Sequence, residues 1–375
     1  GMREAWSARF DHDAVRLCGR LDPLERLLEA GVLRQESSGA LDWVSDSVAE
    51  HVFLRALLAR DSRVSAASVA EWVRLPVSDR VDGALELLGK RLWRQGRGAD
   101  VAGLLDAGVA RGGRLVGAVL VETAPVGTPE EIQAALADWR GHFEALVRTV
   151  EGESERQDGT NKARCQTLVV ALGWYGFEQL KTRMGASLVA RALAVSAVEV
   201  CRGLTELEPA NTRFLRDLAV SYDRVGHMDM RDDPVGAKQW FEAALVIAEE
   251  LVEIEPNDIE FLFDLSGFVV RVGDMDLRDD PAGARFKFER SLDIRKKLVG
   301  LDPRNTRFLH ALSTSYDRLG FIDIREDPER ARRWFEQALA LAEKLVELEP
   351  NNTNFLHSLG AFNERMGAID LRTDV

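Results

Sequence analysis

A spacing of 47 residues recurs through the second half of this 375-residue chain and restricts its fold more than any other feature. Two series of four positions and one series of three share this interval. They are Pro209, Pro256, Pro303 and Pro350; Gly226, Gly273, Gly320 and Gly367; and Pro234, Pro281 and Pro328. A fixed period of about 20 to 50 residues is typical of a solenoid, in which each unit buries its apolar face against the next. We therefore expect a stack of similar units.

Each unit is predicted to hold two amphipathic helices. In the clearest copy, Leu312, Tyr316 and Leu319 lie on one face of a first helix, because residues four and seven apart share a helix face. Ala331 and Phe335 begin the equivalent stripe of a second helix. Polar residues that accept hydrogen bonds from free amides mark both helix starts. They are Asn211, Asp258, Asn305 and Asn352 for the first helices, and Asp233, Asp280 and Asp327, each followed by proline, for the second.

This pattern resembles the tetratricopeptide repeat (TPR) family, whose units carry large, small and aromatic residues at fixed separations. The matching residues are Leu215, Leu218, Ala219, Tyr222 and Gly226 in the first helix, and Ala237, Phe241 and Ala244 in the second. Insertions of about six residues after Tyr222 and about seven after Ala244 extend the family's unit of about 34 residues, so both helices are expected to be longer than usual. The resemblance implies an all-α, right-handed solenoid whose first helices line a concave groove, and a role in binding proteins or peptides.

The pattern divides the chain into three predicted regions. Residues 1–62 form a winged-helix-like region, residues 63–160 form helical hairpins or a linker, and residues 161–375 form the TPR-like solenoid. Within the solenoid we expect a degenerate repeat at about 162–208, complete repeats at about 209–255, 256–302 and 303–349, and a partial repeat at 350–375.

Two short apolar segments near the N-terminus predict a β-hairpin. Residues 32–34 and 41–44 flank the turn-forming stretch 36–39. With the helical patterns around them, they resemble the winged-helix segment of STAND signalling ATPases, the group with NB-ARC and NACHT members. A generic helical cap with a hairpin explains the same residues equally well. A winged helix also suggests DNA binding, but Asp42, Asp46 and Glu50 stand where a recognition helix needs basic residues.

Composition and motifs narrow the possible functions. The net charge of -13 argues against binding to nucleic acids or anionic membranes, since both surfaces repel an acidic chain. Three widely spaced cysteines and the lack of a signal-peptide pattern indicate a cytoplasmic protein. The stretch from Gly83 to Arg91 nearly matches a phosphate-binding loop, but it has five residues between its glycines and an arginine in place of Ser or Thr. We therefore expect no enzymatic activity, no cofactor and no metal.

Charged residues that recur in every unit allow two interpretations. They are Arg224, Arg271, Arg318 and Arg365, together with Asp229, Asp276, Asp323 and Asp370. Either the arginines form a ladder that binds a ligand, or each unit needs the same joint, in which an arginine such as Arg271 pairs with a buried aspartate such as Asp276. The joint is favoured, because ligand contacts usually differ between repeats and joints do not.

Candidate groove residues follow from alignment with the concave positions of the TPR family. They are Arg213, Arg216, Asp223, Arg224, His310, Asp317, Arg318, His357, Glu364 and Arg365. His310 and His357 lie one repeat apart and are interpreted as solvated side chains rather than as a metal pair.

The sequence thus favours a non-enzymatic scaffold or sensor that binds a protein or peptide, with the arm of a STAND-type ATPase as one form of it. The alternative is a winged-helix transcriptional regulator with a TPR region that senses a peptide. We also predict self-association through the C-terminal end, where Phe355, Leu359, Phe362 and Met366 are expected to leave an apolar face partly uncovered.

Overall fold

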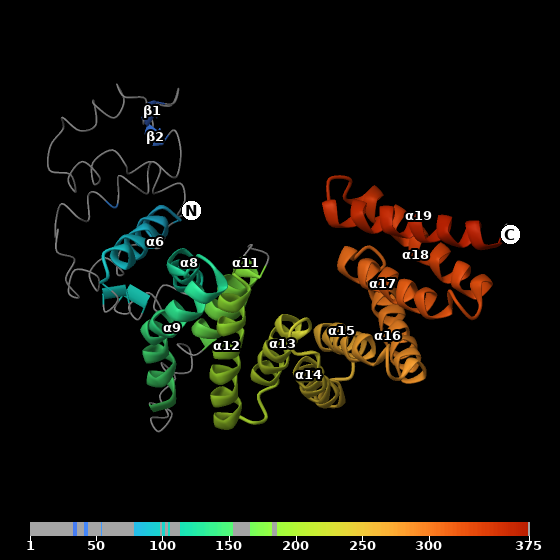
Figure 1. Ribbon diagram of the computed structural model, residues 1–375, viewed down its shortest axis with the longest axis horizontal. Helices are drawn as coiled ribbons and strands as arrows, with labels where there is room; N and C mark the ends of the chain where they lie inside the picture. Colours follow the sequence, from blue (N-terminus) through green and yellow to red (C-terminus); the bar gives the residue numbers. More distant parts are fainter. Residues whose placement is uncertain are drawn as a thin grey trace. The chain divides into compact units, whose positions relative to one another are not determined.

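The computed structural model describes residues 33–35, 41–43, 54, 79–97, 100–101, 104–105, 113–152, 166–181 and 186–373. The chain divides into two compact units, Gly1–Leu207 and Glu208–Val375. Figure 1 labels the helices and strands of both units along the chain.

The first unit contains the predicted β-hairpin. Strand β1 (Leu33–Gln35) pairs antiparallel with β2 (Leu41–Trp43), with Arg34 opposite Asp42. The pairing confirms the hairpin itself. The helices that would complete a winged helix, at about 13–30 and 45–59, lie outside the described residues apart from Leu54, so that interpretation stays a prediction.

The remaining described elements of the first unit are helical. They are α6 (Asp79–Arg94), α8 (Gly113–Thr123), α9 (Pro129–Gly152), the π-helix η2 (Val170–Phe177), α11 (Glu178–Leu180) and α12 (Ser187–Leu207). Helix α8 packs against α6 and η2, and α12 packs against α9 and η2. The near-match to a phosphate loop, Gly83 to Arg91, lies inside α6. Its backbone amides are therefore engaged in helical hydrogen bonds and do not cradle a phosphate.

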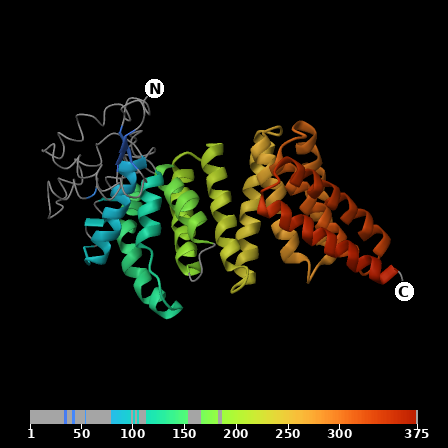
Figure 2. The same ribbon diagram turned by 90° about the horizontal axis from the view of Figure 1, so that it is seen from above.

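The second unit consists of three helical hairpins followed by one further helix. The hairpins are α13 (Thr212–Asp229) with α14 (Pro234–Ile254), α15 (Ile259–Asp276) with α16 (Pro281–Leu301), and α17 (Thr306–Asp323) with α18 (Pro328–Leu348). Helix α19 (Thr353–Thr373) packs on α18. Each hairpin packs against the next, and the helices follow one another in chain order (Figures 1 and 2). This is the predicted all-α solenoid of packed helix pairs.

Helix lengths and boundaries follow the local sequence signals. First helices such as α13 have 18 residues and second helices such as α14 have 21, so the insertions lengthen both helices as expected. The side chain of Asn211 accepts hydrogen bonds from the amides of Arg213 and Phe214, and that of Asp233 accepts one from the amide of Gly236. Because these caps satisfy amides that the helix itself leaves free, the predicted helix starts are confirmed.

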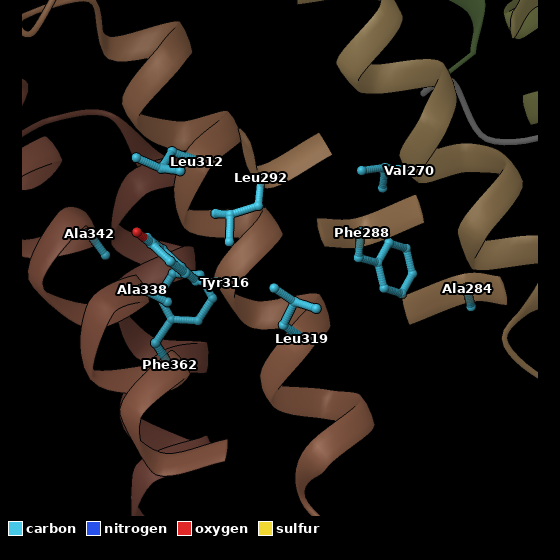
Figure 3. Close-up of a cluster of buried hydrophobic side chains, with 10 residues drawn as sticks. All are labelled: Val270, Ala284, Phe288, Leu292, Leu312, Tyr316, Leu319, Ala338, Ala342 and Phe362. Carbon is cyan, nitrogen blue, oxygen red and sulfur yellow. The ribbon is translucent and has the colours of Figure 1, made fainter. Parts of the chain in front are cut away.

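The core of the second unit is built from recurring aromatic and small residues. Phe241, Phe288 and Phe335 are fully buried in their second helices. Each faces a glycine of the preceding first helix; a Cβ on Gly320 would lie only 2.7 Å from a ring carbon of Phe335. The recurring glycines therefore permit close packing of the two helices. Figure 3 shows one cluster of this core, whose side chains come from all five helices from α15 to α19.

The buried aspartates at the ends of the first helices pair with the second helices, which corrects the predicted Arg–Asp joint. Asp276 is 7% exposed. Its carboxylate accepts hydrogen bonds from Lys238 Nζ of α14 at 2.6 Å and from Lys287 Nζ of α16 at 2.8 Å, rather than from Arg271. Burial opposes ionisation of Asp276, but these two lysines outweigh it and hold its pKa below the ordinary value.

Asp323 occupies the equivalent position one repeat later, and its side chain is fully buried. It pairs with Arg285 of α16. From α18, Arg330 donates through Nε and Nη2 at 2.6 Å each, and Trp334 donates through Nε1 at 3.0 Å. Each carboxylate therefore ties the second helix of its own repeat to the second helix of the repeat before.

The predicted open face at the C-terminal end is also corrected. Phe355 is 8% exposed and Phe362 is 4% exposed, because both pack against α17 and α18. Leu359 is partly buried against the cluster that holds Phe362, and Met366 is partly buried against Ala331 and Phe335 of α18. The preceding hairpin therefore covers the face on which the self-association prediction rested.

Candidate functional site

Consecutive first helices are linked by a series of polar side chains, which we call the first-helix face. Its residues are Arg216, Asp223, Glu260, Asp264, Arg271, Asp274, His310, Asp317, Arg318, Ser358 and Arg365. Six of the ten predicted groove residues belong to it, so the structure brings most of them onto one surface of the second unit.

Two sets of ion pairs join α13 to α15. Arg216 Nε lies 2.6 Å from Asp264 Oδ2, and Arg216 Nη2 lies 2.9 Å from Glu260 Oε2. In the second set the arginine is on α15 and the aspartate is on α13: Arg271 Nε lies 3.3 Å from Asp223 Oδ1. Burial raises the pKa of Asp264 above its ordinary value, although the hydrogen bond from Arg216 acts against this shift.

Later first helices are joined in the same way. Arg318 Nη2 donates a hydrogen bond to Asp274 Oδ2 at 3.1 Å, and Arg318 Nε lies 2.7 Å from Asp274 Oδ1 as an ion pair without hydrogen-bond geometry. Arg365 pairs with Asp317 in the same way: Nη2 donates a hydrogen bond to Oδ2 at 3.2 Å, and Nε lies 2.6 Å from Oδ1. Asp317 is 5% exposed, and burial raises its pKa despite the attraction of Arg365 and Arg318. These ion pairs connect each first helix to the next.

His310 belongs to the face as a neutral group. Its Nε2 lies 3.4 Å from Ser358 Oγ, and its ring lies against that of Phe355, with 5.6 Å between the centroids. Burial, followed by the nearby charge of Arg295, lowers the pKa of His310. It is therefore uncharged at neutral pH and does not pair with His357, which is exposed. Among the described residues, no group of three or more His, Cys, Asp or Glu side chains is arranged to hold a metal ion.

The other four predicted groove residues are Arg213, Arg224, His357 and Glu364. Arg213, His357 and Glu364 are exposed, whereas Arg224 is 6% exposed. The exposed three are available to a partner without breaking any ion pair of the first-helix face. The role of all ten residues in binding stays a prediction.

Sequence reasoning missed the acidic partners Glu260, Asp264 and Asp274. A signal for them exists, because opposite charges stand 44 or 48 residues apart: Arg216 with Glu260 and Asp264, Asp274 with Arg318, and Asp317 with Arg365. These separations equal one 47-residue repeat minus three or plus one. The partner residue therefore lies on the neighbouring first helix, either three residues before or one residue after the equivalent position, within reach of a long side chain.

Comparison with known proteins finds distant similarity to solved structures of repeat proteins. No family model and no curated protein matches the chain. Matching solved structures include a circular tandem repeat protein with novel repeat topology (15% identity, TM-score 0.35, 88% of this chain and 78% of that chain). They also include a de novo designed helical repeat protein (16%, 0.22, 62% and 97%) and the TPR domain of P58(IPK) (15%, 0.21, 96% and 99%).

The assignment of the chain as an all-α helical-repeat solenoid rests on the helix pairs described above. Within the described residues, every helix is too short or too polar to span a membrane.

Proposed function

We propose that this protein is a non-enzymatic binding module whose first-helix face, with the exposed residues around it, holds a segment of another protein. The observation that carries this proposal is a contrast between two sets of equivalent positions. Many core positions keep the same residue in successive repeats, as in Phe241, Phe288 and Phe335. One surface position of the first helices instead reads Arg216, Phe263, His310 and His357.

This contrast is what a binding solenoid requires. A repeat must pack on its neighbour in the same way each time, so its core residues recur. Residues that contact a non-repeating partner are free to differ. The Asp276 and Asp323 joints connect the hairpins at the C-terminal ends of the first helices, away in sequence from this variable position. Substitutions on the surface can therefore change specificity without changing the stack.

Selection from a displayed peptide library tests the proposal, since the partner's identity is not needed. We expect peptides that bind the full chain and lose affinity at least about tenfold when Arg213 or His357 is replaced by alanine. Gln337→Ala is the matched control, because Gln337 is exposed on second helix α18. Peptides that bind all three variants as tightly as the wild type would contradict the proposal.

Two finer interpretations extend the proposal to the N-terminal region. The β1–β2 hairpin is the one observation that favours a winged helix, and with it either the arm of a STAND-type ATPase or a DNA-binding regulator. The net charge of -13 favours the former. Electrophoretic mobility shift at low salt separates the two: salt-sensitive binding to duplex DNA supports the regulator, and its absence supports the ATPase arm.

A further inference from the structure

The middle second helix, α16, places a charged residue where its neighbours have alanine. Arg295 is 6% exposed, and the equivalent residues are Ala248 of α14 and Ala342 of α18. One turn earlier, Ser291 replaces Ala244 and Ala338 in the same way. Burying a guanidinium is costly, so a single repeat that departs twice from its neighbours calls for an explanation beyond packing.

The partners of Arg295 are all uncharged. Its Nε donates to Ser266 Oγ of α15 at 3.2 Å. Its Nη1 lies within 2.6 to 2.9 Å of three oxygens of α17: Ala311 O, Thr314 Oγ1 and Ser315 Oγ. Nη2 makes a single long contact, 3.5 Å from Ser266 O. Nη1 therefore has three acceptors for its two hydrogens, whereas Nη2 has two hydrogens and makes only this one long contact.

The surrounding charges leave one positive charge without a counterpart. Among the described residues, the arginines that act on this point are Arg295 itself, Arg271 and Arg318, and the last two are paired with Asp223 and Asp274. Burial, followed by repulsion from Arg271 and Arg318, lowers the pKa of Arg295 to about 10, so it remains charged at neutral pH. Each aspartate has its own arginine, and Arg295 has none.

The guanidinium of Arg295 lies beneath the first-helix face. Its contact with Thr314, which is only half-buried, places it directly under the surface between α15 and α17. We propose that this surface, over Arg295 and between Arg271 and Arg318, binds one singly charged oxyanion such as a carboxylate. A group of this kind would use the free donors of Nη2 and balance the excess charge. That the oxyanion belongs to a bound protein segment rests on the proposed function; the site itself does not.

Thermal unfolding in sodium acetate, compared with sodium chloride at equal ionic strength, tests the site. We expect the melting temperature of the wild type to rise saturably with acetate, by about 3 °C at ten times the dissociation constant. The double variant Ser291→Ala/Arg295→Ala gives α16 the residues of α14 and α18, so it should fold, and it should lose the rise. Arg278→Ala, at a side chain 92% exposed, should keep it.

The ion's charge is tested with sodium sulfate. Because only one charge is unbalanced and Asp274 is close, sulfate should saturate at higher concentration than acetate. A lower saturating concentration for sulfate would overturn the assignment of a singly charged ligand. An acetate effect that persists in the double variant, or no saturable effect in the wild type, would overturn the site.

A second measurement uses the wild type alone. The Nε–H resonance of Arg295, identified by its loss in the double variant, should shift on acetate titration; a constant resonance would overturn the site. No partner segment is present in either experiment, so their failure leaves the proposed function standing, and failure of the peptide selection leaves the oxyanion site standing.

Discussion

Replacing Asp323 by alanine should destabilise the second unit more than any exposed substitution. Asp323 is fully buried, and its carboxylate is held by Arg285, Arg330 and Trp334 from the two second helices on either side. Breaking a buried ion pair by removing one partner costs about 3–5 kcal/mol, because the other charge is left buried. Here the side chains of Arg285 and Arg330 are 24% and 40% exposed and can recover water. We therefore expect the low end of that range.

The expected loss is about 3 kcal/mol of unfolding free energy, or a melting temperature lower by roughly 6 to 12 °C. Urea unfolding followed by helical circular dichroism measures it. Asp279→Ala is the control, because that side chain is 80% exposed and pairs only with the exposed Arg278. It should stay within about 0.5 kcal/mol of the wild type.

A double-mutant cycle tests the reasoning as well as the magnitude. Asp323→Ala should couple to Arg285→Ala by about 1 kcal/mol or more, since the two side chains interact directly. It should not couple to Arg318→Ala, whose partners are Asp274 and Asp317. Coupling to Arg318 without coupling to Arg285 would restore the arginine–aspartate joint expected from the sequence and refute the contacts described here.

Three further predictions follow from the same contacts. The pKa of Asp276 is lowered in the folded protein, so the ionised carboxylate stabilises the fold above the unfolded pKa of about 3.9. This stabilisation is lost as the pH falls through the folded pKa. The difference in unfolding free energy between the wild type and Asp276→Asn should therefore be larger at pH 7 than at pH 3. Gly320→Ala should lower the unfolding free energy in urea by about 1–3 kcal/mol, because the new Cβ forces Phe335 aside. Gly267→Ala, with open space at its Cβ, should be neutral or stabilising. Equal effects of the two substitutions would count against the close packing of Gly320 on Phe335. Isothermal titration should show no ATP or GTP binding, since the stretch from Gly83 to Arg91 is helical; micromolar affinity would contradict this.

Local signals made much of the second unit predictable. The caps at Asn211 and Asp233 define helix starts from residues two or three positions away, and the 47-residue period carries each assignment to the next repeat. The hairpin of β1 and β2 was equally local.

Contacts between helices were harder to predict, because they depend on which neighbour a side chain reaches. One partner of Asp276 is Lys238, and one partner of Asp323 is Arg285, each 38 residues earlier in the preceding second helix. The sequence repeats this signal, since Arg191 and Arg332 precede Asp229 and Asp370 by the same interval. The sequence analysis instead paired each aspartate with an arginine close to it in the chain, such as Arg271 with Asp276. At α19, Phe355 and Phe362 were assigned to the wrong side because both faces of a first helix carry apolar residues, and only packing on α17 and α18 distinguishes them.

The most direct test of the proposed function is site-specific photo-crosslinking with a selected peptide. A photoreactive amino acid at His357, exposed on first helix α19, should capture the peptide, and the same group at Gln337, exposed on second helix α18, should not. Mass spectrometry of the products gives the yield at each position. A strong preference for position 357 supports binding along the first helices, and equal yields, or a preference for position 337, would contradict it.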